Sequence, residues 1–572
     1  MVTVRQPMAR NRARVAGRDF AGHHLLMIFT VIVVLAPILP ILYQSFLDAP
    51  LYRDEATLTT QNYSDLFTSP TLRTVIVDSL LFGLGATVVA VFIGTAAAIV
   101  IGRIKIPFAR LLDELQLWPL YLSPLILAFG WVITYGPAGY VSLFIDQKLG
   151  MTFPGIYNLP GLMIIAGISQ APFIYLFTRS SVMASNANLE DAARSVGAPP
   201  GRVIRSIIGP MLRPPILYGV LLTFATSIEM LSIPLIIGRP VGIRLIASYL
   251  YEEGVLSPRP DYGLLASMSV LLLIFVALLI AIQSKLLGNV ARFVTVEGKA
   301  TPARKFDVGA ARWVYFGLLV LYVIFGVLIP TIGIAVRACV GILTPLVPIA
   351  DVLTWGNFEH IFTVGVYQRS ITNSLLLSVV GGAVAALVVT GIVLVSQRSE
   401  YRFRGSLDQL SIWPRAVPGV VMGLGFFWLI LLLGLSGVRS SLWLLALVFF
   451  VRFLPHGYAA TAPMMMRFSR DLDRSARAAG AGWWTMVRHI LFPLAKPAIF
   501  SSYVLLFLLF LKEYASAVFL YSSGNEIIGV TMLSAWTQGN VGPVAALVVF
   551  QLLVSVVIIY AARRLLGVRI NA

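Results

Sequence analysis

The sequence has one cysteine, Cys339, and a single cysteine excludes an internal disulfide and a metal site built from several cysteines. Charged residues are also scarce, at 12% of 572, where soluble domains have roughly a quarter. The chain lacks a GxxxxGKS or GxxxxGKT phosphate loop, an HExxH zinc motif and a serine-histidine-acid set, and its five histidines are scattered. These absences exclude a soluble domain. They predict a chain that is not an enzyme, with no catalytic residue and no cofactor of its own.

Hydrophobic residues make up 58% of the chain, and the mean hydropathy is +0.87. Runs of about 20 apolar residues are long enough to cross a membrane as helices, and the alternating pattern of a membrane barrel is absent. We therefore predict an all-α polytopic membrane protein with about twelve spans. They lie at about 25–46, 76–102, 114–136, 159–183, 214–238, 263–287, 313–336, 371–396, 409–434, 440–466, 497–521 and 543–566.

The net charge of +18 comes from 43 lysines and arginines against 25 acidic residues. Five arginines precede the first apolar run, and most other basic residues fall in alternate loops on the same side as this tail. Because basic residues favour the cytoplasmic side, the pattern predicts cytoplasmic N- and C-termini and an uncleaved first helix. This distribution indicates a membrane lipid environment and does not indicate a nucleic-acid partner.

The chain repeats itself. LTTQNYSDLF at 58–67 matches LTWGNFEHIF at 353–362, and LWPLYLSP at 117–124 matches IWPRAVPG at 412–419, both at an offset of 295. Further along, the offset becomes 283, a change that one loop can absorb. We predict two homologous halves of six spans each: a basic cytoplasmic tail (1–24), the first half (25–287), a cytoplasmic linker (288–312), the second half (313–566) and a C-terminal tail (567–572).

The loop between the fourth and fifth spans of each half is charged and rich in alanine and glycine. It reads LEDAARSVGAPPGRVIRSIIGP at 189–210 and LDRSARAAGAGWWTMVRHILFP at 472–493. Helical spacing followed by Gly197, and a second short helix from Pro200 that ends before Pro210, predict a helix-turn-helix at the membrane surface. An amphipathic connector would show a similar pattern, but a connector need not be duplicated.

This pattern resembles the cytoplasmic signature loop of bacterial type I ABC importer permeases: an acidic residue, two alanines, three residues and a glycine. The second copy departs from it, because Arg474 stands at the acidic position and Asp473 is the nearest carboxylate. The residues assigned to the two loops (184–213 and 467–496) are Glu190, Asp191, Ala192, Ala193, Gly197, Asp473, Ser475, Ala476 and Gly480.

The resemblance covers about residues 58 to 565 and implies the type I ABC permease fold in the bacterial inner membrane. It implies that each loop docks as a coupling helix into a cleft on an ATPase subunit. Two copies of an ABC ATPase, which bind ATP and Mg, and a periplasmic or lipid-anchored substrate-binding protein are then the expected partners.

Shorter motifs resemble the fused two-half permeases of the ferric-iron importer group. They are VRFLPHG (451–457), FLKEYASAVFL (510–520), IPLIIG (233–238), RPDYGLLAS (259–267) and LSAWTQGNVGPVAAL (533–547). This resemblance implies ferric iron as the cargo. Importer permeases for thiamine, a polyamine or a phosphonate are the alternatives.

Ionisable residues inside a span cost about 2.5–3.5 kcal/mol each at its centre and usually face the interior of the helix bundle. Glu229 and Glu513 fall at near-equivalent places in the two halves, and we expect both to approach a pathway between the halves. Carboxylates suit a hard trivalent cation, so the two are candidates for transient metal contact. An ion pair of Glu513 with Arg452 that only holds two spans together is the alternative. The pathway candidates are Glu229, Glu513, Lys512 and Arg452.

These observations favour a permease subunit that works by alternating access, driven by separate ATPases. An ion-coupled secondary transporter also uses repeats and charges inside the membrane, but its repeats are often inverted, and it has no need of paired docking loops. A membrane enzyme, the third class, lacks a catalytic constellation here. If the chain is a permease subunit, we expect an ATPase subunit to copurify with it.

Overall fold

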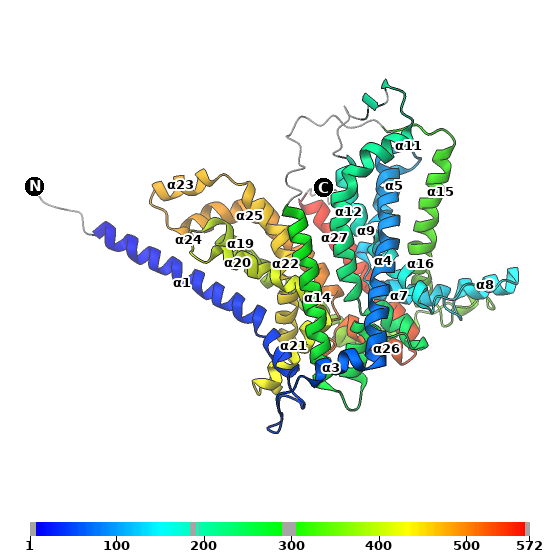
Figure 1. Cartoon of the computed structure of the whole chain (residues 1–572), viewed down its shortest axis with the longest axis horizontal. Helices are drawn as coiled ribbons and strands as arrows, with labels where there is room; N and C mark the ends of the chain where they lie inside the picture. The colour runs from blue at the N-terminus through cyan, green and yellow to red at the C-terminus, as the bar shows by residue number, and fades with distance from the viewer. Residues whose placement is uncertain (1–6, 184–189, 191, 194, 289–304, 567–572) are drawn as a thin grey trace, which may run out of the picture. The chain divides into compact units, whose positions relative to one another are not determined.

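The computed structural model describes residues 7–183, 190, 192–193, 195–288 and 305–566, and this part of the chain is almost entirely helical (Figure 1). Within it, extended pairing is limited to three isolated bridges, such as Ile104 with Phe306. Eleven helices of the described residues are long and apolar enough to cross a membrane, or twelve with one bent pair. The prediction of an all-α polytopic membrane protein is confirmed.

The chain divides into two compact units, each of which combines segments from both halves of the sequence. One unit comprises 1–62, 363–534 and 553–572, and the other comprises 63–362 and 535–552. The first span of each predicted half therefore belongs to the unit built mainly from the other half. The last helix of the described residues, α27 (Val541–Leu566), contributes to both units.

In the first unit, α1 and α2 accompany spans from the second half of the chain. Gly425 of α21 lets the backbone of the first span approach, because a Cβ there would lie 2.3 Å from the carbonyl oxygen of Pro37. The helices of this unit are α1 (Pro7–Leu35), α2 (Ile38–Gln44), α18 (Gly365–Leu376), α19 (Gly382–Arg398), α20 (Arg404–Ile412), α21 (Gly419–Leu432), α22 (Leu442–Arg467), α23 (Arg470–Ala478), α24 (Trp483–Met486) and α25 (Phe492–Lys512). The ninth predicted span is the bent pair, in which 404–416 and 419–432 meet at 106°. Helix α26 (Ile528–Thr537) crosses the boundary between the units.

In the second unit, α4 packs along α9, and α16 packs on α7 (Figure 1). Trp131 and Tyr135 of α7 donate hydrogen bonds to the carbonyl oxygens of Gly326 and Phe325, at 3.1 and 2.8 Å. The helices are α3 (Gln61–Thr68, at the boundary), α4 (Pro70–Arg103), α5 (Ala109–Gln116), α6 (Trp118–Tyr121), α7 (Pro124–Tyr135), α8 (Tyr140–Leu149), α9 (Leu159–Met183), α11 (Pro200–Val203), α12 (Gly209–Ile228), α13 (Ile246–Tyr251), α14 (Tyr262–Gly288), α15 (Ala311–Val323), α16 (Ile329–Ala338) and α17 (Gly356–Thr363, at the boundary).

The sequence repeat reappears as equivalent contacts, one in each unit. Ser79 Oγ accepts a hydrogen bond from the Ile246 N–H at 2.8 Å, and Ser374 Oγ accepts one from the Ile528 N–H at 2.9 Å. The hydroxyl of Tyr175 donates to Asp113, and that of Tyr458 donates to Asp408. Both serines and both aspartates are related by the offset of 295 found in the sequence, and both tyrosines by 283.

Candidate functional site

The second signature loop begins with a short capped helix. Ser469 Oγ accepts a hydrogen bond from the Asp471 N–H at 3.1 Å, which satisfies a backbone donor at the start of α23. Asp473 and Ala476 point into the protein and are buried, whereas Ser475 and Gly480 are exposed. The helix therefore has an inner face that packs and an outer face that is open in this chain.

The two signature loops turn in the same way. Gly197 has a φ of 81° and Gly480 a φ of 82°, as predicted for a left-handed helix stop. The following N–H groups close the turn, from Ala198 to the Ala193 oxygen and from Ala481 to the Ala476 oxygen, both at 3.0 Å. Open space surrounds both glycines, so the backbone conformation, and not crowding, requires glycine here.

The helix after the turn is longer than predicted. From Pro200 the chain stays helical through α11, a π-helical turn (Ile204–Ile208) and α12 to Ile228, so the prediction of a short helix ending before Pro210 is wrong. The π-helical turn provides the reason, because the Gly209 N–H donates to the Ile204 oxygen, five residues back. This wider turn accommodates Pro210, which would disrupt the hydrogen bonds of a regular α-helix. A π-helical turn at Val487–Leu491 precedes Pro493 in the second copy.

The first loop is described at residue 190, 192–193 and from 195 onward, and Asp191 lies outside the described residues. Ala192 is exposed, and Ala193 packs against a buried apolar cluster that includes Val203 and Ile208. Glu190 is buried and forms an ion pair with Arg103, with Oε1 and Nη2 2.9 Å apart.

Asp473 of the second loop has an equivalent partner. Its carboxylate lies 3.5 Å from Nη2 of Arg398, which also donates through Nη1 to the Phe468 oxygen at 3.0 Å. The sequence analysis missed both Arg103 and Arg398. The information was present, because the two arginines differ by 295 and their carboxylate partners by 283, the two offsets of the repeat.

The sequence analysis placed the candidate pathway carboxylates inside spans. In the structure, both lie at helix ends. Helix α12 ends at Ile228 with Glu229 as its C-cap, and α25 ends at Lys512 with Glu513 as its C-cap. The apolar pattern continues past each residue, into a short buried π-helical segment (Pro234–Gly238) after Glu229 and into buried turns after Glu513, and hydropathy does not distinguish these from a continuing helix. Both glutamates therefore occupy the same kind of position in their units. Their approach to a common pathway stays a prediction.

Glu513 is held from two sides. Its Oε2 lies 3.2 Å from Nε of Arg452, and its Oε1 accepts from the N–H and the hydroxyl of Ser516 at 2.8 and 3.0 Å. Two glycines at the start of α21 make room, because a Cβ on Gly419 would lie 2.6 Å from Cζ of Arg452, and one on Gly423 would lie 2.4 Å from the Ser516 oxygen. The ion pair proposed from sequence is thus present.

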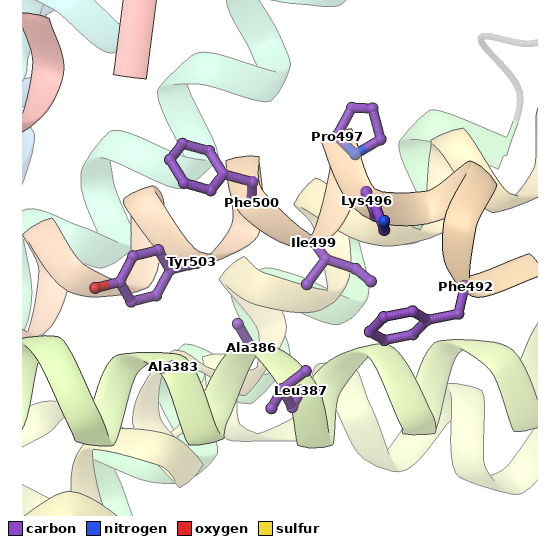
Figure 2. A pocket seen from close by; sticks show the side chains of 9 residues that line it. All are labelled: Ala383, Ala386, Leu387, Phe492, Lys496, Pro497, Ile499, Phe500 and Tyr503. Atoms are coloured by element: carbon purple, nitrogen blue, oxygen red, sulfur yellow. The ribbon is translucent and has the colours of Figure 1, made fainter. Parts of the chain in front are cut away.

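A cavity of about 480 Å³ lies in the same unit, between α19 and α25 (Figure 2). Its lining is almost entirely apolar, with Leu387, Phe492 and Phe500 among the side chains, and Lys496 and Tyr503 also border it. The sequence analysis did not anticipate it. Among the described residues, no group of three or more His, Cys, Asp or Glu side chains could hold a resident metal ion.

A sequence model for the binding-protein-dependent transport system inner membrane component matches this chain twice, at 90–296 and 387–571. The chain belongs to this family. It is an ABC importer permease with two fused permease domains, a non-enzymatic and multi-pass membrane subunit, as the resemblance implied.

Curated relatives resemble the chain over most of its length. The putative ferric transport system permease protein FbpB 1 of Haemophilus influenzae is 23% identical over 88% of this chain and 78% of its own. The ferric transport system permease protein FbpB of Actinobacillus pleuropneumoniae is 23% identical over 82% of this chain and 67% of its own. The probable ABC transporter permease protein y4fN of Sinorhizobium fredii is 23% identical over 91% and 92%.

Proposed function

We propose that this permease imports ferric iron as the membrane subunit of an ATP-driven, binding-protein-dependent transporter. The observation that carries the proposal is the duplicated loop: the same left-handed glycine turn, at φ 81° and 82°, in two permease domains of one chain. Two relatives named as ferric transport permeases favour this cargo.

In this proposal each loop docks on one of two ATPase subunits, which bind ATP and Mg and carry out hydrolysis. The exposed outer face of α23, which includes Ser475, and the exposed turn at Gly480 are the surface available for docking in the second loop. The first loop uses the equivalent residues, from Asp191 to Gly197. When ATP draws the ATPases together, the loops move with them, and the pathway opens alternately to either side.

The cargo reaches the pathway from a binding protein on the outer side, with both termini of this chain in the cytoplasm. Glu229 and Glu513 supply oxygen ligands that suit a hard trivalent cation, and the Arg452 guanidinium orients the Glu513 carboxylate. Contact is transient, since an importer must release what it carries. This chain's own contribution is the pathway and the coupling of its loops to hydrolysis.

The test is uptake by proteoliposomes that contain the permease with its ATPase, with ferric iron loaded on the cognate binding protein. We expect ATP-dependent uptake of iron that fails without either partner. If the purified binding protein carries thiamine, a polyamine or a phosphonate and no iron is taken up, that compound and not ferric iron is the cargo. Iron uptake that persists without ATPase and follows an ion gradient would establish a secondary transporter instead.

A further inference from the structure

The end of the second span in the first half is tied to the signature loop by a buried ion pair. Arg103 is the last residue of α4, and Glu190 opens the described part of the loop. Nη2 and Oε1 are 2.9 Å apart, and each side chain is only 2% exposed. The Arg103 carbonyl oxygen also accepts from the Phe306 N–H at 2.7 Å, so the linker is fastened to the same point.

The second half repeats this arrangement. Arg398 is the last residue of α19, and Asp473 lies in α23 of the second loop. The ion pair is 3.5 Å long, with side-chain exposures of 3% and 11%. Arg398 also donates to the carbonyl oxygens of Phe468 and Ser469, at 3.0 and 3.4 Å, where the fourth span ends and the loop begins.

The two pairs are equivalent by sequence as well as by contact. Arg103 and Arg398 are 295 residues apart, and Glu190 and Asp473 are 283 apart, which are the two offsets of the repeat. Taking a charge out of water is costly unless it is paired, and a well-packed apolar pair is often as stable as a buried ion pair. The same costly pair in both halves therefore points to a requirement for defined geometry at this junction.

This equivalence changes the interpretation of the acidic position. Asp473 is not a displaced docking residue, because its carboxylate faces Arg398 inside the permease, as Glu190 faces Arg103. The next residue along the chain is Asp191 in the first loop, which lies outside the described residues, and Arg474 in the second. Arg474 is 79% exposed and pairs with the exposed Asp471.

We propose that Arg103–Glu190 and Arg398–Asp473 are paired latches, which transmit the displacement of each docked loop to the second span of its half. The four are positioning residues and do not contact cargo. This inference rests on the proposed function, since it requires ATPases on the loops. A loop that is free of its latch moves with the ATPase without moving the span, so hydrolysis continues while transport fails.

The experiment compares the reconstituted complex of permease, ATPase and binding protein in single and double variants. The single variants are Arg103→Gln, Glu190→Gln, Arg398→Gln and Asp473→Asn. We expect each to retain the ATPase and hydrolyse ATP, while cargo moved per ATP falls about tenfold, within the usual range of coupling between two sites. Two double variants combine the two changes of one latch, Arg103→Gln with Glu190→Gln and Arg398→Gln with Asp473→Asn. We expect each to move as much cargo per ATP as its single variants, because the single and double changes remove the same interaction.

An exposed ion pair beside the first latch provides the matched control. Lys105→Gln with Asp307→Asn removes an ion pair of 3.6 Å whose side chains are 59% and 62% exposed, and we expect transport per ATP to stay as in the wild type. A fall in that control equal to the fall in the latch variants would overturn the proposal. So would a Glu190→Gln variant that loses the ATPase while Arg103→Gln keeps it, since the carboxylate would then contact the ATPase.

Charge exchange covers variants that do not assemble. Each charge reversal alone, Arg398→Asp or Asp473→Arg, is expected to lose assembly or coupling. The two combined are expected to regain both, and failure to regain both contradicts the latch. Failure of the proposed function is separate and visible first: the unaltered chain would retain no ATPase, or would move no cargo with it.

Discussion

The two signature loops have the same backbone conformation at the turn but differ in the charge of one residue. Their comparison separates contacts that the fold requires from residues available to a partner protein. The turns at Gly197 and Gly480 agree to within one degree in φ, and each loop is latched to an arginine at the end of a span. The residue that follows the paired carboxylate in the sequence is Asp191 in one loop and Arg474 in the other. The buried ion pairs are duplicated, whereas the charge of the next residue is not. Two changes in the loops test this distinction directly, and two changes at carboxylates elsewhere in the chain extend it to other ion pairs. They are given from the largest expected effect to the smallest.

Replacing Gly197 and Gly480 together by valine should abolish ATPase retention. A β-branched residue in the left-handed region costs on the order of 1–3 kcal/mol, and both loops would have to refold their turns. Copurification of the ATPase measures the effect. Gly201→Val is the matched control, because Gly201 lies in the same loop with open space and without a positive φ. An ATPase retained equally by both variants would contradict a docking role for the turns.

Glu513→Gln should impair uptake and destabilise the protein, by about 3 kcal/mol, because it removes one charge of a largely buried ion pair. Glu229→Gln, at the equivalent helix end, should impair uptake as well. Uptake in proteoliposomes and thermal unfolding in detergent separate the two effects. Unchanged uptake in both variants would remove these carboxylates from the pathway and leave Glu513 a purely structural residue.

Glu526→Gln should lower stability at neutral pH by on the order of 1 kcal/mol, because Arg369, its partner at 2.8 Å, is half-exposed and water screens the pair. Burial raises the pKa of Glu526, but hydrogen bonds from Arg369 and the Gly524 N–H outweigh burial and hold the pKa below 4.5.

Since the folded pKa of Glu526 is lowered, the carboxylate stabilises the protein above pH 4.5, and this contribution is lost as pH falls through the folded value. Thermal unfolding of both proteins between pH 7 and pH 3 measures it. The variant should be less stable than the wild type at pH 7, and the difference in stability should disappear at low pH. A difference in stability that is the same at every pH would refute the assignment.

Arg474→Asp, which gives the second loop the charge of the first, should have the smallest effect. The side chain is solvated, so we expect ATPase affinity to change by less than about threefold at moderate salt, with transport per ATP unaltered. Titration of ATPase binding at two salt concentrations checks this. A large loss of affinity would show that the two docking surfaces are specialised, and that outer charge matters as much as the inner latch.

Local sequence patterns predicted the spans and both glycine turns, because apolar length and left-handed backbone are properties of short segments. They did not predict where α12 and α25 end, since Glu229 is followed by a short buried π-helical segment and Glu513 by buried turns, both with the composition of a span. The helix through Pro210 was missed because a π-helical turn accommodates the proline. The latch arginines depend on contacts between residues 75 or more positions apart, which only the repeat offsets could have indicated.

The exchange of first spans between the compact units has a consequence for biosynthesis. Tyr135 reaches its carbonyl partner at Phe325 only after some 190 further residues have been made, and Pro37 meets Gly425 later still. Early helices must therefore wait in the bilayer, inserted but without their final neighbours, until translation is well into the second domain. A ribosome that stalls in the linker leaves both units unfinished, because each unit includes segments that are made after the linker.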